Sequence, residues 1–373
     1  MAKRLPVTVI TGFLGAGKTT VLRHLLTRGG QRLAVMVNEF GSVGLDGDLI
    51  RSCGFCPEED VDGRLVELNN GCLCCTVQDD FLPTMETLLE RADQLDGIVV
   101  ETSGLALPRP LLQALDWPAI RSRVHVNGVV TLVDGEALAA GSPVADAEAL
   151  ERQRAEDPSL DHLTAIDELF EDQLKAADLV LISRADCLDA SAMAEVQGLI
   201  QGKVRPGTAL LPVSQGQVET SVVLGLEHKP TAQAHTHHDH DHHDHDHHDH
   251  DHHDHSHVDM VSSNVRVEGA LDRQALEQLL PSLVSNHQVV RLKGRVWLPS
   301  KALPLQIQMV GPRLNSWFEA APSHAWRPDQ GCGADLVVLA LNEAAAPALE
   351  SGLQRLVQAT PAKASPAAAT PES

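Results

Sequence analysis

The 373-residue sequence lacks several features, and each absence narrows the range of functions. No apolar run approaches the ~18 residues of a membrane-spanning helix, and the N-terminus has no cleavable apolar stretch, so we expect a cytoplasmic protein with no membrane partner. Positive charge is also scarce, since 29 Lys and Arg stand against 51 Asp and Glu, for a formal net charge of −22. Because binding to nucleic acid needs basic surface, we expect no nucleic-acid partner.

What the chain does have is enough apolar sequence for packed cores, at 43 % hydrophobic residues, and an unusual supply of metal-binding side chains. The length favours two domains, or three. In a reducing compartment the seven cysteines do not suggest a disulfide framework, so metal-binding or catalytic thiols are the alternatives.

The first 214 residues alternate short apolar strands with amphipathic helices. Near-continuous aliphatic runs are typical of strands buried on both faces of a mostly parallel sheet. We therefore expect residues 1–225 to form a doubly wound α/β domain whose ligands bind beyond the carboxyl ends of the strands. The expected strands are Val7–Thr11, Leu33–Val37, Ile98–Glu101, Val129–Val133, Leu179–Ile182 and Ala209–Pro212, and the expected helices are Thr19–Arg28, Asp80–Leu95, Leu163–Ala177 and Ala190–Gln201.

The composition changes abruptly after Pro230. The tract His235–His257 holds 14 His and 7 Asp and nothing that could form a core, so residues 226–261 are expected to be a flexible linker. Ordinary globular sequence returns over residues 262–358, where strand and helix patterns predict a small α+β domain without a catalytic constellation. The Ala/Pro-rich residues 359–373 are expected to be a disordered tail.

A phosphate-binding loop lies between the first expected strand and the first helix. The segment Gly12–Thr19 fits the pattern GxxxxGK[ST], in which glycines let backbone N–H groups turn toward phosphates. Lys18 would supply charge to the β- and γ-phosphates, and the Thr19 hydroxyl would bind Mg²⁺. The pattern predicts a P-loop NTPase domain whose nucleotide-binding residues are Gly12, Gly15, Ala16, Gly17, Lys18, Thr19 and Thr20.

A carboxylate ends the third expected strand, at the same edge of the sheet. Glu101 is placed to act on the Mg²⁺ side of the nucleotide, usually through water, and Gly104 can bring its N–H to the γ-phosphate. We therefore assign the catalytic role to Lys18, Thr19 and Glu101.

The segment Ser183-Arg184-Ala185-Asp186 follows a later strand, where GTPases carry an Asn-Lys-x-Asp element. Asp186 can accept two hydrogen bonds from the edge of guanine, which discriminates against adenine. Arg184 can lie over the base plane, and Ser183 is a shorter anchor than Asn. The expected nucleotide is therefore GTP.

Three thiols within four residues suggest a binding site for a d-block cation. Cys72, Cys74 and Cys75 offer more soft donors than packing needs, and as thiolates they would bind a roughly tetrahedral metal with a fourth ligand from elsewhere. A buried cysteine cluster or a redox pair is the alternative. The second CxxC, at Cys53 and Cys56, is equally compatible with a structural loop. Glu39 could contact Mg²⁺, the bound metal or only solvent.

The histidine tract adds a second set of metal ligands. Neutral imidazoles bind Co²⁺, Ni²⁺, Cu²⁺ and Zn²⁺, and the interleaved Asp raises the local cation concentration. An unstructured ligand pool would collect metal without selecting cobalt. A purification tag or a merely solvating linker are the alternatives. The ligands assigned here are His235, His237, His238, His240, His242 and His243.

These motifs occur in an order that resembles the CobW family. The resemblance rests on the phosphate loop, Asn38–Gly41, Gly71–Cys75 and Glu101–Gly104, and it covers nearly the whole chain. Members are metal-handling P-loop GTPases with Glu at the strand-end position, a His-rich linker and a small C-terminal domain. The resemblance implies GTP hydrolysis to GDP and phosphate, coupled to transfer of a divalent metal.

Within the family, four segments are most similar to members associated with cobalamin biosynthesis: Leu68–Val77, Asp79–Phe81, Gly104–Pro108 and Glu168–Leu174. This closer resemblance implies delivery of Co²⁺ to a cobaltochelatase. The family also includes zinc chaperones, for which the cargo would be Zn²⁺ and the acceptor another metalloenzyme. Two functions of other classes stay open: a His-rich metal store with a regulatory nucleotide site, and a P-loop kinase acting on a small metabolite.

Overall fold

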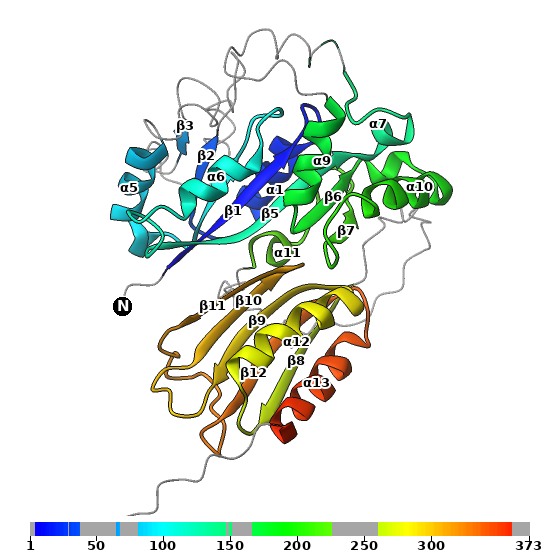
Figure 1. Cartoon of the computed structure of the whole chain (residues 1–373). Helices are drawn as coiled ribbons and strands as arrows, with labels where there is room; N and C mark the ends of the chain where they lie inside the picture. The colour runs from blue at the N-terminus through cyan, green and yellow to red at the C-terminus, as the bar shows by residue number, and fades with distance from the viewer. Residues whose placement is uncertain are drawn as a thin grey trace, which may run out of the picture.

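The computed structural model describes residues 4–28, 30–37, 65–67, 81–146, 148, 150, 166–225 and 260–359. These stretches form two sheet-containing domains, the N-terminal one above the other in Figure 1. The expected metal ligands Glu39, Cys72, Cys74, Cys75 and the histidine tract lie outside the described residues, as do Cys53 and Cys56. Within the described stretches no helix is long and apolar enough to cross a membrane.

Among the described residues, the N-terminal domain contains a seven-stranded sheet in the order β3-β2-β4-β1-β5-β6-β7. Every neighbouring pair is parallel, and β1, β4 and β6 are buried along their whole length. The expected mostly parallel α/β fold is confirmed. The strands are β1 (Leu5–Gly12), β2 (Leu33–Val37), β3 (Leu65–Glu67), β4 (Gly97–Glu101), β5 (Val124–Asp134), β6 (Leu179–Ser183) and β7 (Ala209–Pro212).

Helices pack on both faces of this sheet, because successive side chains along a strand point to opposite faces. Leu179 and Leu181 of β6 join the core that contains α1, whereas Val180 and Ile182 pack with α9 and α10. A third cluster contains α5 and α6. The helices described in this domain are α1 (Lys18–Arg28), α5 (Leu82–Glu90), α6 (Pro108–Leu115), α7 (Gly135–Ala139), α9 (Ile166–Ala176), α10 (Ala190–Gln201) and α11 (Thr220–Leu224).

The C-terminal domain is a five-stranded antiparallel sheet, in the order β11-β10-β9-β12-β8, with two helices packed on one face. Asp272 caps the first helix by accepting a hydrogen bond from the N–H of Ala275 at 2.9 Å. The expected small α+β domain is confirmed. Its elements are β8 (Val261–Glu268), α12 (Arg273–Asn286), β9 (Val289–Trp297), β10 (Leu305–Val310), β11 (Arg313–Phe318), β12 (Gly333–Ala340) and α13 (Ala345–Ala359).

Strand β5 begins at Val124, five residues before the strand that the sequence predicts from Val129. The additional segment carries two polar side chains, His125 and Asn127, which interrupt the aliphatic pattern and which the structure buries. His125 Nε2 lies 2.9 Å from Gln308 Oε1 of the C-terminal domain, and Asn127 bonds both to that domain, at Arg291, and to its own, at Thr8. The polar groups that interrupt the aliphatic pattern are therefore paired inside the fold, partly across the domain junction.

Other boundaries also differ from the sequence-based expectation. The expected helix Asp80–Leu95 ends at Glu90 and is followed by a 3₁₀ turn at Ala92–Gln94. In the N-terminal domain, strand β3 and helices α6, α7 and α11 are not among the expected elements. Each of these helices has eight residues or fewer, which gives too little periodicity to recognise.

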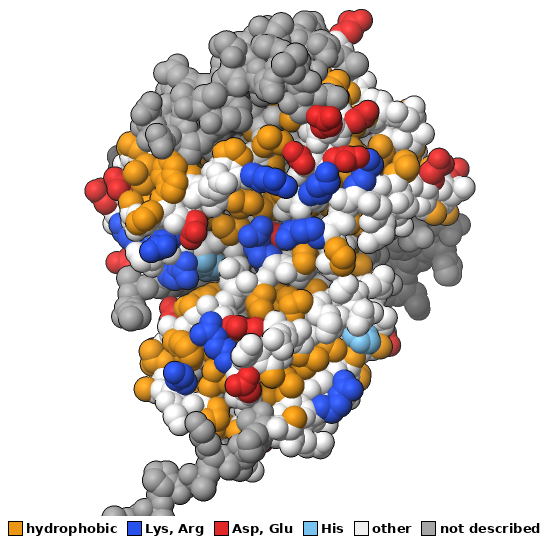
Figure 2. Space-filling model, in the orientation of Figure 1, with side chains coloured by type: hydrophobic (Ala, Val, Ile, Leu, Met, Phe, Trp, Pro, Cys, Tyr) orange, Lys and Arg blue, Asp and Glu red, His pale blue; other side chains and the backbone are white. Residues whose placement is uncertain are grey.

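The two domains are joined by a shared apolar core and by a buried carboxylate. Val290 and Val310 of the C-terminal domain belong to the same cluster as α1. Asp178, which immediately precedes β6, is fully buried and pairs with Arg205 of its own domain and Arg313 of the other. Figure 2 shows Lys and Arg side chains gathered across the middle of this face, where the domains meet. These contacts fix the position of the C-terminal domain against the N-terminal sheet.

Candidate nucleotide site

The expected phosphate loop turns from β1 into α1. Gly12, Gly15 and Gly17 have φ angles of 137°, 77° and 94°, a region that favours glycine, so the loop needs these residues at these places. The buried Lys18 ammonium donates to the carbonyl oxygens of Gly12 at 2.9 Å and Phe13 at 3.0 Å. Lys18 is therefore held by the loop's own carbonyls in this structure, and its role at a bound phosphate stays a prediction.

The structure brings Thr19 and Glu101 together. Thr19 Oγ1 donates to Glu101 Oε1 at 3.1 Å, and only 4 % of Glu101 is exposed. Glu101 ends β4 beside Ile10 of β1, and Thr19 lies in the first turn of α1, which follows the loop after β1. Hydroxyl and carboxylate oxygens are the ligands that Mg²⁺ prefers, so this pair fits a magnesium ion at the loop. The assignment of Mg²⁺ to these residues stays a prediction.

Gly104 lies directly against the phosphate loop. A Cβ added at Gly104 would lie 2.6 Å from the backbone nitrogen of Leu14, so only glycine allows this approach. The fully buried side chain of Gln173 donates from Nε2 to the carbonyl oxygens of Gly104 at 3.1 Å and Ala106 at 3.2 Å. Gln173 was missed as a site residue, although a lone polar residue on the apolar face of a predicted helix was the available signal.

The segment Ser183–Asp186 lies at the same edge of the sheet. Ser183 Oγ donates to the Val133 carbonyl at 3.2 Å, and its Cβ lies 3.7 Å from a Cβ built on Gly17, next to the phosphate loop. Asp186 is exposed to solvent. The structure thus brings the expected base motif and the phosphate loop to one place, and the preference for guanine stays a prediction.

Arg184 has partners that the sequence did not suggest. Its backbone is left-handed, with a φ of 54°, and its Nη1 lies 3.0 Å from Asp134 Oδ2 and 3.3 Å from Glu136 Oε2. Asp134 is also the N-cap of α7, accepting from the N–H of Ala137. In this structure Arg184 is therefore tied to the start of α7, and its expected place over the base plane stays a prediction.

The loop after β7 is a further part of this edge that sequence reasoning missed. Ala185 N donates to the Val213 carbonyl at 3.2 Å, which ties this loop to the base motif. Gly216 has a φ of 70°, and a Cβ there would lie 2.9 Å from Thr20 Cγ2. A glycine-containing loop after the last parallel strand was the available signal, since the carboxyl ends of parallel strands share one edge.

No group of three or more His, Cys, Asp or Glu side chains that could hold a metal occurs within the described stretches. Cys187, beside the base motif, is a single thiol there. Desolvation by its neighbours and the carboxylates of Glu136 and Asp186 raise the pKa of the Cys187 thiol.

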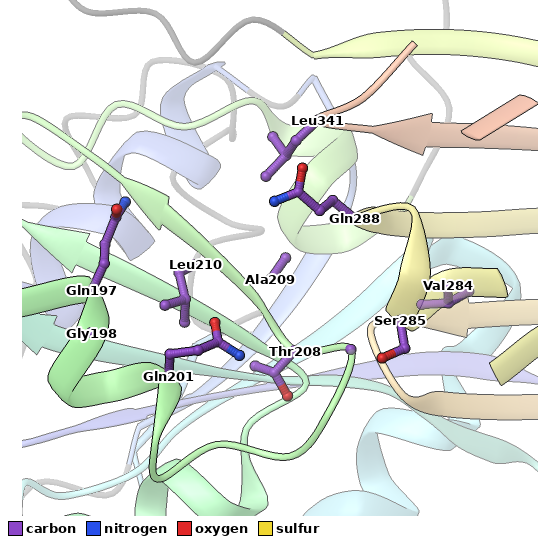
Figure 3. A pocket seen from close by; sticks show the side chains of 11 residues that line it. Gln197, Gly198, Gln201, Thr208, Ala209, Leu210, Val284, Ser285, Gln288 and Leu341 are labelled. Atoms are coloured by element: carbon purple, nitrogen blue, oxygen red, sulfur yellow. The ribbon is translucent and has the colours of Figure 1, made fainter. Parts of the chain in front are cut away.

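A cavity of about 540 Å³ lies at the opposite edge of the sheet, between the domains (Figure 3). Gln197 and Gln201 of α10 line it from one side and Gln288 from the other. Thr208, which also lines it, precedes β7, whereas the phosphate loop follows β1, and these positions lie at opposite ends of a parallel sheet. The cavity is therefore separate from the nucleotide site.

A parallel sheet with a glycine-rich phosphate loop, a hydroxyl–carboxylate pair beside it and a base motif at the same edge defines a P-loop GTPase. A family model described as "CobW/HypB/UreG, nucleotide-binding domain" matches residues 6–211. A second, described as "Cobalamin synthesis protein cobW C-terminal domain", matches residues 260–357. The chain belongs to the CobW family.

Relatives in this family are similar over most of the chain. A protein of Pseudomonas aeruginosa named "Zinc chaperone CobW" is 46 % identical over 343 residues, which cover 90 % of this chain and 87 % of the relative. A Sinorhizobium protein of the same name is 41 % identical over 360 residues, covering 95 % and 98 %. Among solved structures, the Zn(II)-bound YjiA GTPase from E. coli is 19 % identical, covering 95 % of this chain and 99 % of that one, with a TM-score of 0.39.

Proposed function

We propose that this protein is a GTP-hydrolysing metallochaperone that carries Zn²⁺ to an acceptor metalloenzyme in the cytoplasm. The observation that carries the GTPase half is the contact of Thr19 Oγ1 with Glu101 Oε1 at the phosphate loop. The metal half is supported by Cys72, Cys74 and Cys75 in the sequence and by relatives named for zinc. The same names move the favoured cargo away from Co²⁺ and a cobaltochelatase, which stay untested.

The sheet register supports a link between the cysteine-containing segment and the nucleotide, because β3, which precedes that segment in the sequence, ends at the same side of the sheet as Glu101. Glu67, the last residue of β3, pairs with Val37 of β2, and Val37 pairs with Glu101 of β4. The chain therefore leaves β3 at the edge where Glu101 meets the phosphate loop. A metal held by thiolates in this segment would be sensitive to the state of the nucleotide.

In this proposal the residues at the loop act by positioning and charge. Lys18 would turn from the loop carbonyls toward the phosphates, and Thr19 and Glu101 would hold Mg²⁺, which would supply positive charge to neutralise the phosphates. Gly104 offers its N–H to the γ-phosphate, while Gln173 keeps that peptide in place through the Gly104 and Ala106 carbonyls. Asp186 selects guanine.

Coupling between nucleotide and metal must be reciprocal. If GTP tightens the binding of Zn²⁺, then Zn²⁺ tightens the binding of GTP by the same factor. Hydrolysis would then loosen the thiolate site and release the cargo to its acceptor. A pure metal store has no such requirement, since its nucleotide site could be removed without loss of function.

The test is competitive affinity for Zn²⁺ and Co²⁺, measured with Mg²⁺ and either a non-hydrolysable GTP analogue or GDP. We expect Zn²⁺ to bind more tightly in the GTP-analogue form and to lose that site in the Cys72/Cys74/Cys75→Ser variant. Equal Zn²⁺ affinity in the two nucleotide forms would refute the chaperone mechanism. If the GTP-analogue form binds Co²⁺ tightly enough to be filled at the intracellular concentration of free Co²⁺, but does not bind Zn²⁺ tightly enough to be filled at that of free Zn²⁺, the cargo would be Co²⁺.

Two variants separate the chaperone from the metal store. In a chaperone, Lys18→Ala abolishes delivery to the acceptor, and deletion of residues 235–257 only lowers the supply of metal. In a store, the deletion removes most function and Lys18→Ala is nearly silent.

A further inference from the structure

A buried arginine of the C-terminal domain contacts the end of a short helix in the GTPase domain. Arg291 of β9 is 6 % exposed, and its guanidinium donates to the carbonyl oxygens of Val222 and Val223, in the last turn of α11. It also donates to Asn127 Oδ1 at 3.2 Å. Helix C-terminal carbonyls carry partial negative charge, so a cation is well placed there.

Asn127 completes the same arrangement from β5. Its Nδ2 donates to the Leu224 carbonyl at 2.8 Å and to Thr8 Oγ1 at 2.8 Å. The last three carbonyls of α11 are therefore all satisfied by Arg291 and Asn127. Burial lowers the pKa of Arg291 to about 9, with partial compensation by Asp178, so the group is still charged at neutral pH. Loss of the guanidinium would leave buried carbonyls without donors.

Helix α11 connects directly to the nucleotide edge. Its residues Val222, Val223 and Leu224 pack in one core with α1, the helix that begins at the phosphate loop. The loop just before it, residues 213–217, lies against the first turn of α1 at Gly216 and bonds to the base motif through Val213. A shift of α11 would therefore move a loop that touches both halves of the nucleotide site.

We propose that Arg291 is a positioning residue for the nucleotide site: the C-terminal domain uses it to hold α11, and through α11 the loop 213–217, in the conformation that binds guanine nucleotide. The inference rests on the proposed assignment of the base site to this edge. The C-terminal domain would then influence nucleotide binding from a distance, because it contacts the sheet near Asp178 and Gly128, at the end opposite the phosphate loop.

The junction offers a matched control. Arg313 is also an arginine of the C-terminal domain that reaches across to the GTPase domain, but its partner is Asp178, before β6. The variants Arg291→Met and Arg313→Met each remove one interdomain guanidinium of the same size. A general loosening of the junction would affect nucleotide binding equally in both, whereas positioning of α11 would affect only the first.

The experiment measures the affinity of the full-length protein for a fluorescent GTP analogue, with Mg²⁺, and amide hydrogen exchange of peptides covering residues 213–225. We expect Arg291→Met to weaken the affinity by about tenfold and to speed exchange in that segment, and Arg313→Met to leave the affinity within about twofold. Arg291→Lys keeps the charge and should recover part of the affinity. If Arg291→Met does not fold, Arg291→Lys against Arg313→Lys gives the same comparison.

Equal effects of the two substitutions, or an affinity unchanged by Arg291→Met, would overturn the inference. Failure of the wild-type protein to bind guanine nucleotide would instead count against the proposed function. Hydrogen exchange over residues 213–225 is compared between wild type and the two variants without nucleotide. It therefore tests whether Arg291 holds this segment, whether or not the wild-type protein binds guanine nucleotide.

Discussion

Replacing Gly104 with alanine should slow GTP hydrolysis by roughly 10- to 100-fold. The added Cβ would lie 2.6 Å from the Leu14 nitrogen and 3.2 Å from its Cα, and both are backbone atoms that cannot rotate away. An ordinary contact starts at 3.4 Å, so the loop after β4 and the phosphate loop must separate by roughly 0.8 Å. A misplacement of about 1 Å in a catalytic arrangement costs on the order of 100-fold in rate.

The assay for this prediction is phosphate release at saturating GTP, together with thermal unfolding. Overpacking of this kind destabilises by about 1–3 kcal/mol, so the variant should still be folded at the assay temperature. Gly198→Ala is the control, because Gly198 lies in α10 with nothing within 4 Å of a new Cβ. That variant should gain about 0.5–1 kcal/mol of stability and keep its turnover. A Gly104→Ala enzyme with a kcat within twofold of wild type would refute the placement of Gly104 against the nucleotide.

Two further substitutions test other parts of the structure. Gln173→Leu removes the donors to the Gly104 and Ala106 carbonyls. The kcat for phosphate release should therefore fall, while the affinity for GDP, measured by fluorescence, should change little. An unchanged kcat would contradict the positioning role of Gln173. Leu280→Ala leaves a cavity at a fully buried position in the C-terminal core and should lower the free energy of unfolding, measured by denaturant titration, by about 2–5 kcal/mol. The control Leu199→Ala changes a side chain that is 46 % exposed and should lower it by less than about 0.5 kcal/mol. Similar losses in the two variants would contradict the assigned core.

Local patterns were sufficient for the central elements of the fold. The aliphatic runs of β1, β4 and β6 predicted strands buried on both faces, and those strands are buried throughout. The phosphate loop could be recognised because its glycines occupy backbone conformations that side chains disfavour, at a fixed spacing. The contact of Thr19 with Glu101 agrees with the same pattern, since Thr19 begins the helix after the phosphate loop and Glu101 ends the strand next to β1.

Polar residues in buried places could not be interpreted from the sequence. His125 and Asn127 interrupt the aliphatic pattern of β5, and Gln173 interrupts the apolar face of α9, but no local pattern names their partners. Nothing near Arg291 in the sequence indicates its partners either. Each of these buried polar groups is stabilised by hydrogen bonds to residues far away in the sequence. Arg291 and Asn127, for example, are 164 positions apart.

The sequence by itself determined the class and family of the protein, and it predicted the residues of the phosphate loop, the strand-end carboxylate, the base motif and the clustered thiols. These are local signals, because each depends on residue types at short, fixed spacings. Only the tertiary structure decided which end of the sheet meets the C-terminal domain, that Gln173 supports the Gly104 loop, and that Arg291 caps α11. Such contacts join segments remote along the chain, and a buried polar group has a partner only once both segments have folded against each other.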